Sequence, residues 1–65
     1  MSAYQRLINA PGFEPRHVEA YLRLEYGTLD HLSLDQFKNA VLVACELIDV
    51  EGFENAELLA KSYGL

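Results

Sequence analysis

Residues 33–50 limit the fold more than any other stretch of this chain, because a helix start signal there is followed by an unusually apolar run. SLDQ, residues 33–36, matches a capping box, in which the serine and glutamine side chains each accept from a backbone amide that a helix start leaves free. NAVLVACELI, residues 39–48, then has eight apolar residues in ten. A buried strand is the competing interpretation of AVLVAC, but the capping signal, two alanines and the length favour a helix over residues 34–50.

This predicted helix has a narrow polar strip and a wide apolar arc when its residues are projected at about 100° per residue. Leu42 lies in the middle of the polar strip, which also holds Asp35, Lys38, Asn39, Glu46 and Asp49. The apolar arc holds Leu34, Phe37, Ala40, Val41, Val43, Ala44, Cys45, Leu47 and Ile48. An arc this wide exceeds what one helix at the edge of a domain needs, so we expect the helix to be central and the other helices to pack around it.

Three further helices are predicted from their boundary signals. Pro15 suits a first helical turn and Gly27 suits the residue after a helix end, which predicts a helix over residues 15–26. On this helix we expect His17 to edge the core with its polar tip in water, and a buried arc of Val18, Tyr21, Leu22, Leu24 and Tyr26. Residues 53–63 form a shorter predicted helix, and residues 2–9 a short first helix with Tyr4, Leu7 and Ile8 inward. The predicted fold is all-α: one compact bundle, residues 1–65, of three main helices plus a short N-terminal one.

A chain of 65 residues buries a small core, so its stability is often supplemented by a disulfide, a metal or self-association. Cys45 is the single cysteine, which excludes an intrachain disulfide, and two histidines are too few for a structural zinc site. We therefore expect no metal and no cofactor, and a homodimer stays open. The longest apolar run, AVLVAC, is far shorter than the roughly 20 residues that span a bilayer, so we expect a protein that does not bind membranes. The single cysteine fits a reducing compartment, so we expect a cytoplasmic protein.

Cys45 is the residue that an enzyme hypothesis would use. It lies within the apolar arc and beside Glu46, with no lysine or arginine within six residues. Such surroundings raise the pKa of a thiol and leave it inert, whereas a nucleophilic cysteine needs a cationic and partly exposed neighbourhood. We expect a core cysteine and a protein that is not an enzyme, and keep a small enzyme or enzyme subunit using Cys45 and a histidine as an alternative.

The negative charge of the chain is concentrated in its C-terminal half. The formal charge of −5 arises within residues 39–60, which contain five acids, Glu46, Asp49, Glu51, Glu54 and Glu57, and no lysine or arginine. DNA affinity depends largely on lysine and arginine, and this chain has 5 such bases against 10 acids, so we expect no direct binding of nucleic acids. A helix-turn-helix-like DNA-associated regulator using Arg16 and Arg23 remains an alternative.

The expected function is a non-catalytic, acidic protein–protein interaction module, such as an adaptor, a regulator or an inhibitor. Leu42 and the acids Glu46, Asp49, Glu51, Glu54 and Glu57 are the predicted contact residues, and a protein with a basic surface is the predicted partner. The competing interpretation is that these acids only keep a small protein soluble.

Overall fold

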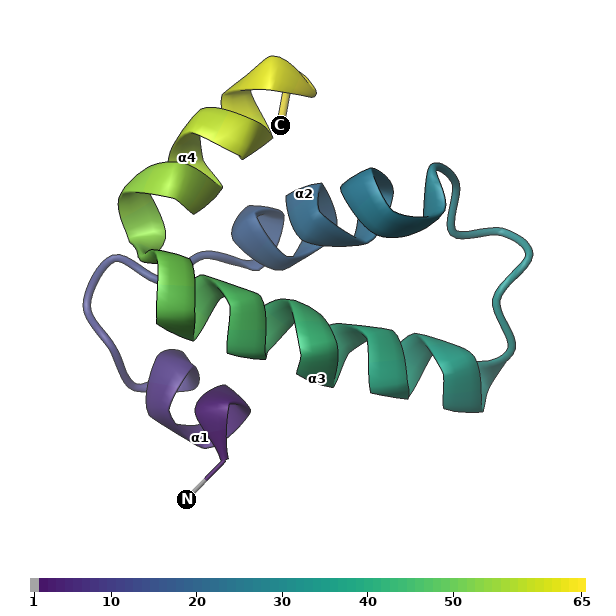
Figure 1. The fold of residues 1–65 in the computed structure, drawn as a ribbon, viewed down its shortest axis with the longest axis horizontal. Helices are drawn as coiled ribbons and strands as arrows, with labels where there is room; N and C mark the ends of the chain where they lie inside the picture. Colours follow the sequence, from purple (N-terminus) through teal and green to yellow (C-terminus); the bar gives the residue numbers. More distant parts are fainter. Residues whose placement is uncertain (1) are drawn as a thin grey trace.

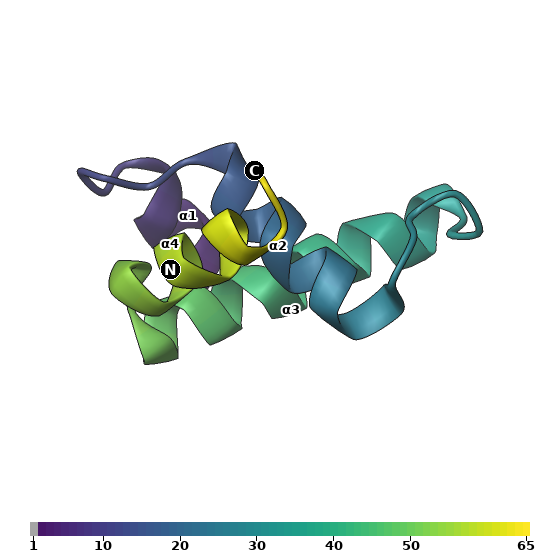
Figure 2. The ribbon, with the colours of Figure 1, turned by 90° about the horizontal axis from the view of Figure 1, so that it is seen from above.

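The computed structural model describes residues 2–65, and in this part of the chain it contains four helices and no strand. The helices are α1 (Ala3–Ile8), α2 (Pro15–Tyr26), α3 (Leu34–Glu51) and α4 (Phe53–Ser62) (Figure 1). The predicted all-α bundle of three main helices and a short N-terminal one is therefore confirmed. Its principal extents are 31 × 29 × 15 Å, so the helices form a flattened body, as the view from above shows (Figure 2).

The helices begin where their local signals predict. Ser33 and Gln36 form the predicted capping box: the Ser33 hydroxyl accepts from the Gln36 amide at 3.2 Å, and the Gln36 side chain accepts from the Ser33 amide at 2.8 Å. Ser2 and Gln5 form a second box at the start of α1. Gly52 separates α3 from α4 with a φ of 94°, which only glycine adopts readily. Local sequence therefore sets the helix boundaries.

Helix α3 has the central position that its sequence predicts. It packs against α1, α2 and α4, and the most extensive packing between two helices is that of α2 on α4. In Figure 1, α1 lies below α3 while α2 and α4 lie above it. The core between the helices is rich in small residues; its buried apolar side chains are Ala3, Leu7, Ala20, Tyr21, Leu22, Ala40, Ala44, Cys45, Ile48, Ala56 and Ala60.

The apolar arc of α3 is buried over a smaller part than predicted. Ala40, Ala44, Cys45 and Ile48 are buried. Four residues predicted to face inward are exposed instead, at 69% for Leu34, 39% for Phe37, 51% for Val43 and 38% for Leu47. For Leu34 and Phe37 the reason is length, because α1 has 6 residues against 18 in α3 and covers only part of it. Val43 and Leu47 lie on a different side of α3, beside α2.

The predicted inward faces of α1 and α2 are also only partly correct. Leu7, Tyr21 and Leu22 are buried as expected, whereas Tyr4, Ile8, Leu24 and Tyr26 are exposed. His17 was expected to have its polar tip in water, but it is buried, with only 2% of its surface exposed. Apolar periodicity thus identified the helices correctly but overestimated how much of each helix its neighbours cover.

Candidate functional site

Two adjoining hollows form an open apolar groove over the N-terminal half of α3. The larger, of about 420 Å³, is lined by Tyr4, Ile8, Phe13, Pro15, Val18, Glu19, Leu22, Leu29, Phe37 and Val41. The second, of about 410 Å³, is lined by Tyr4, Phe37, Lys38, Val41 and Leu42. Because Tyr4, Phe37 and Val41 line both hollows, we treat them as one surface and call it the apolar groove.

Three helices shape the apolar groove. Tyr4 and Ile8 lie four residues apart on α1 and therefore on the same side of it, while Ala3 and Leu7 of the same helix point into the core. Val41 belongs to α3, and α2 contributes the opposite wall with Val18 and Leu22. Short α1 leaves this region uncovered, so the groove follows from the helix lengths.

Leu42 lies at one end of the apolar groove. Its side chain is 46% exposed, as its place in the polar strip of α3 predicts, and it lines the same hollow as Tyr4 of α1. This neighbour was not predicted, because nothing in the spacing of either helix indicates that α1 packs beside Leu42. The exposure of Leu42 is therefore predictable from α3 alone, whereas its place in a groove is not.

The five acids of the predicted contact surface have different partners in the fold. Asp49 accepts from the Arg6 guanidinium at 2.6 Å, and Glu57 accepts from Arg16 at 2.5 Å. The phenol of Tyr21 donates to the carboxylate of Glu51 at 3.3 Å. Two of the acids are thus neutralised by bases that are distant in the sequence, and three of them contact α1 or α2. The folded chain therefore has fewer unpaired acids in this region than the sequence suggests.

Glu46 and Glu54 are the acids that remain open to solvent. Both are exposed, and neither has an ion pair with another residue in the described range 2–65. Glu51 is exposed as well. Within the described residues, these three carboxylates can therefore meet a partner without first giving up an ion pair.

His17 joins α2 to α4 in a closed polar network. Its Nδ1 accepts from the Glu14 backbone amide at 3.3 Å, so the proton of the neutral ring lies on Nε2, which contacts the Glu57 carboxylate at 2.9 Å. Arg16 donates to Glu57, to the Glu14 carboxylate at 2.6 Å and to the carbonyl of Leu65 at 3.3 Å. The expected exposed tip of His17 is thus wrong, because the packing of α4 on α2 brings Glu57 over the imidazole.

The same network shifts the acidities of its carboxyl groups. Hydrogen bonds from His17 and Arg16 hold the pKa of Glu57 below its ordinary value, and Arg16 does the same to the pKa of Glu14. Phe13 and Phe53 pack on the imidazole with ring centroids 6.4 and 6.0 Å away. A histidine sealed in this way stabilises the α2–α4 interface and has no access to a substrate.

Cys45 is buried at 1% exposure, as its sequence neighbourhood predicts. This burial raises the pKa of its thiol, so the reactive thiolate is disfavoured. Within residues 2–65 no three histidine, cysteine, aspartate or glutamate side chains gather as metal ligands would. Cys45 is therefore a buried core residue.

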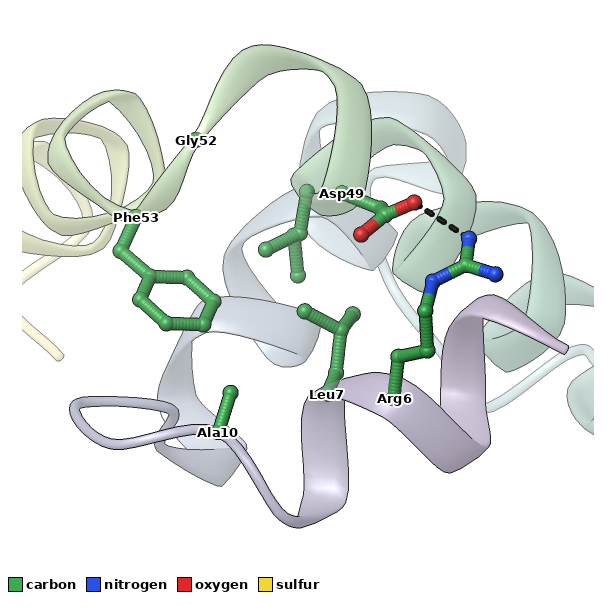
Figure 3. Close-up of a pocket in the computed structure, with 7 residues that line it drawn as sticks. Arg6, Leu7, Ala10, Asp49, Gly52 and Phe53 are labelled. Atoms are coloured by element: carbon green, nitrogen blue, oxygen red, sulfur yellow. Dashed lines mark hydrogen bonds and ion pairs between the residues drawn. The ribbon is translucent and has the colours of Figure 1, made fainter. Parts of the chain in front are cut away.

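A smaller hollow of about 220 Å³ lies between α1 and the α3–α4 corner (Figure 3). Arg6 and Asp49 form their ion pair at one side of it, and the ring of Phe53 stands at the other. Leu7, Ala10, Ile48 and Gly52 complete a mostly apolar wall. With its two charged groups bound to each other, this hollow has fewer features of a binding site than the apolar groove.

No helix in the described part of the chain combines the length and apolar character needed to cross a membrane. No protein-family model matches the sequence, and no similar curated protein or solved structure was found.

Proposed function

We propose that this protein is a non-catalytic protein–protein interaction module that acts as an adaptor, a regulator or an inhibitor. The observation that supports this most directly is the apolar groove, in which exposed aromatic and aliphatic side chains from three helices adjoin one another. Single exposed apolar residues are ordinary on a protein surface, but contiguous apolar patches are typical of binding sites.

The shape of the groove favours a helical segment as its occupant. Helix α3 forms the base, with α1 along one side and α2 along the other, which is the arrangement in which grooves receive the apolar face of a helix. Tyr4 and Phe37 provide aromatic contact area, and burying apolar surface contributes about 25 cal/mol per Å². Leu42 would then contact the partner at one end, as expected from its exposure.

The acids add an electrostatic preference for a basic partner. The chain has a formal charge of −5, and Glu46, Glu51 and Glu54 are exposed. Such a field attracts a positively charged surface and raises its rate of association at low ionic strength. Asp49 and Glu57, which pair with Arg6 and Arg16, contribute less to this attraction.

The contacts give less support to the two alternative functions. A DNA-associated regulator would use Arg16 and Arg23, but Arg16 is held by two glutamates and Arg23 lies 3.6 Å from Glu19. We therefore expect no salt-dependent retention on immobilised DNA, and strong retention would favour this alternative. An enzyme using Cys45 would need a thiol that reagents reach in the folded protein.

We also propose a cytoplasmic location, because a single free cysteine fits a reducing compartment.

Affinity capture from the native host with matched variants tests the proposed function. Tyr4→Gln and Leu42→Gln change exposed residues of the groove, and Leu58→Gln is the control because Leu58 is 62% exposed and lies outside it. We expect a partner that the unaltered protein and the Leu58 variant retain and that both groove variants lose. Identical retention by all four proteins would show that the groove is not the binding surface.

Sedimentation at several concentrations decides whether the occupant is a second copy of the chain. A homodimer formed through the groove would dissociate in the Tyr4→Gln and Leu42→Gln variants and persist in Leu58→Gln. A monomer at all concentrations would leave another protein as the occupant.

A further inference from the structure

Helix α3 has a second apolar surface on the side that faces away from the groove. Val43, Leu47 and Val50 follow one another at intervals of four and three residues, which places them along one side of the helix. Their exposures are 51%, 38% and 84%. At about 100° per residue, this side lies opposite Val41, which lines the groove. We call these three residues the outer strip.

Helix α2 extends the outer strip at its N-terminal end. Tyr26 lines a small hollow of about 50 Å³ together with Val43 and Leu47, and the residue is 39% exposed. Glu25 lines the same hollow. The strip is therefore a continuous apolar surface with an aromatic side chain at one end.

Acidic residues border the outer strip. Glu46 lies three residues after Val43 and four before Val50, so it adjoins both on the helix surface, and Glu51 follows Leu47 by four residues. Glu25 is the third acid, and all three are exposed.

The bases nearest this border pair with other acids, although Arg6 lines a hollow together with Glu46 and Val50. No lysine or arginine lines the hollow of Val43 and Leu47. Arg6 is near Val50, but its guanidinium pairs with Asp49 at 2.6 Å. On α2, Arg23 pairs with Glu19. An apolar strip thus lies between acids whose charge the adjacent bases leave largely uncompensated.

We propose that the outer strip binds a basic amphipathic helix of another protein, with the apolar side of that helix on Val43, Leu47 and Val50. Lysine and arginine on either side of the partner's apolar stripe would then meet Glu25, Glu46 and Glu51. A second copy of the chain fits this surface poorly, because its own strip has the same acidic border and like charges would oppose each other. This inference does not depend on the groove. Together, the two surfaces of α3 would let the protein hold two partners at once.

Binding of synthetic peptides to the full chain tests the proposal. One fluorescent peptide of about 18 residues, five helical turns, has a leucine stripe flanked by lysines. A second peptide keeps the stripe and replaces every lysine with glutamate, and a third is a scrambled version of the first without a stripe. We expect the lysine peptide to bind roughly tenfold or more tightly than either of the others, with an affinity that falls as salt is added.

Matched variants then locate the peptide on the protein. We expect Leu47→Gln and Glu46→Gln each to weaken the lysine peptide by roughly threefold to tenfold, while Leu58→Gln, at a leucine that is 62% exposed and lies outside both the groove and the outer strip, leaves its affinity unchanged. Circular dichroism of each variant establishes that it is folded. Equal binding of the lysine and glutamate peptides, or an equal loss in the Leu58 and Leu47 variants, would overturn the proposal.

Discussion

The α2–α4 interface predicts a specific loss of stability when His17 is replaced by phenylalanine. Phenylalanine keeps a ring between Phe13 and Phe53, but it removes both nitrogens through which the imidazole contacts the Glu14 amide and the Glu57 carboxylate. The replacement therefore separates the hydrogen bonds of His17 from its packing.

The expected cost follows from the two interactions that are lost. A hydrogen bond within a protein contributes about 0.5–1.5 kcal/mol net, so His17→Phe should lower the free energy of unfolding by about 1–3 kcal/mol. A chain of 65 residues is expected to have about 3–10 kcal/mol in total, so the loss is a large fraction. The midpoint of thermal unfolding should fall by about 4–8 °C for each kcal/mol.

Urea denaturation followed by circular dichroism measures this change. His17→Ala is the matched comparison: it removes the same hydrogen bonds and also leaves a cavity in a site that is only 2% exposed, so it should be the less stable variant. If His17→Phe were as stable as the unaltered protein, the hydrogen bonds would contribute nothing. If both variants were equally stable, the packing of the imidazole on Phe13 and Phe53 would be irrelevant.

Three further predictions concern pH, the α3–α4 corner and Cys45. The pKa of Glu57 in the folded state is lowered from its ordinary value of 4.5, so its ion pairs stabilise the protein fully above that pH and lose effect as the pH falls through the lowered pKa. On acid titration, the Arg16→Gln variant should therefore lose less of its free energy of unfolding than the unaltered protein loses. Gly52→Ala should lower the free energy of unfolding, measured by urea denaturation, by about 1–3 kcal/mol. The space around Gly52 is open, but its φ of 94° strains any residue that has a side chain. Unchanged stability would mean that the corner rearranges. A thiol reagent should label Cys45 slowly in the folded protein and rapidly in urea, and rapid labelling of the folded protein would revive the enzyme alternative.

The fold was largely predictable because the signals for helix boundaries are local. Ser33 with Gln36, Pro15 at the start of α2, and Gly27 and Gly52 at helix ends each act within a few residues of the chain. Local hydrogen bonds and backbone preferences decide these positions whatever the rest of the chain does. The predicted helix over residues 34–50 accordingly differs from α3 by one residue.

The polar network could not be predicted, because its partners are distant in the sequence. His17 and Glu57 are 40 residues apart, and only the packing of α4 on α2 brings them to 2.9 Å. The periodicity of α2 places His17 on its apolar side but does not indicate which carboxylate will cover it. The pairing of Asp49 with Arg6 is hidden in the same way, since it depends on where α1 lies along α3.

The distribution of large and small apolar residues explains why both candidate surfaces lie on α3. Three of the four residues at 0% exposure are alanines, Ala20, Ala56 and Ala60, the fourth being Ile48, and alanine lets helix backbones approach closely while burying little area. Larger side chains such as Phe37 and Val43 remain outside the core. A partner that covers them adds apolar burial to a fold whose own core supplies little, and any ligand that binds only the folded state raises its stability. Binding and stability should therefore be coupled more strongly here than in a protein whose large apolar residues are already buried.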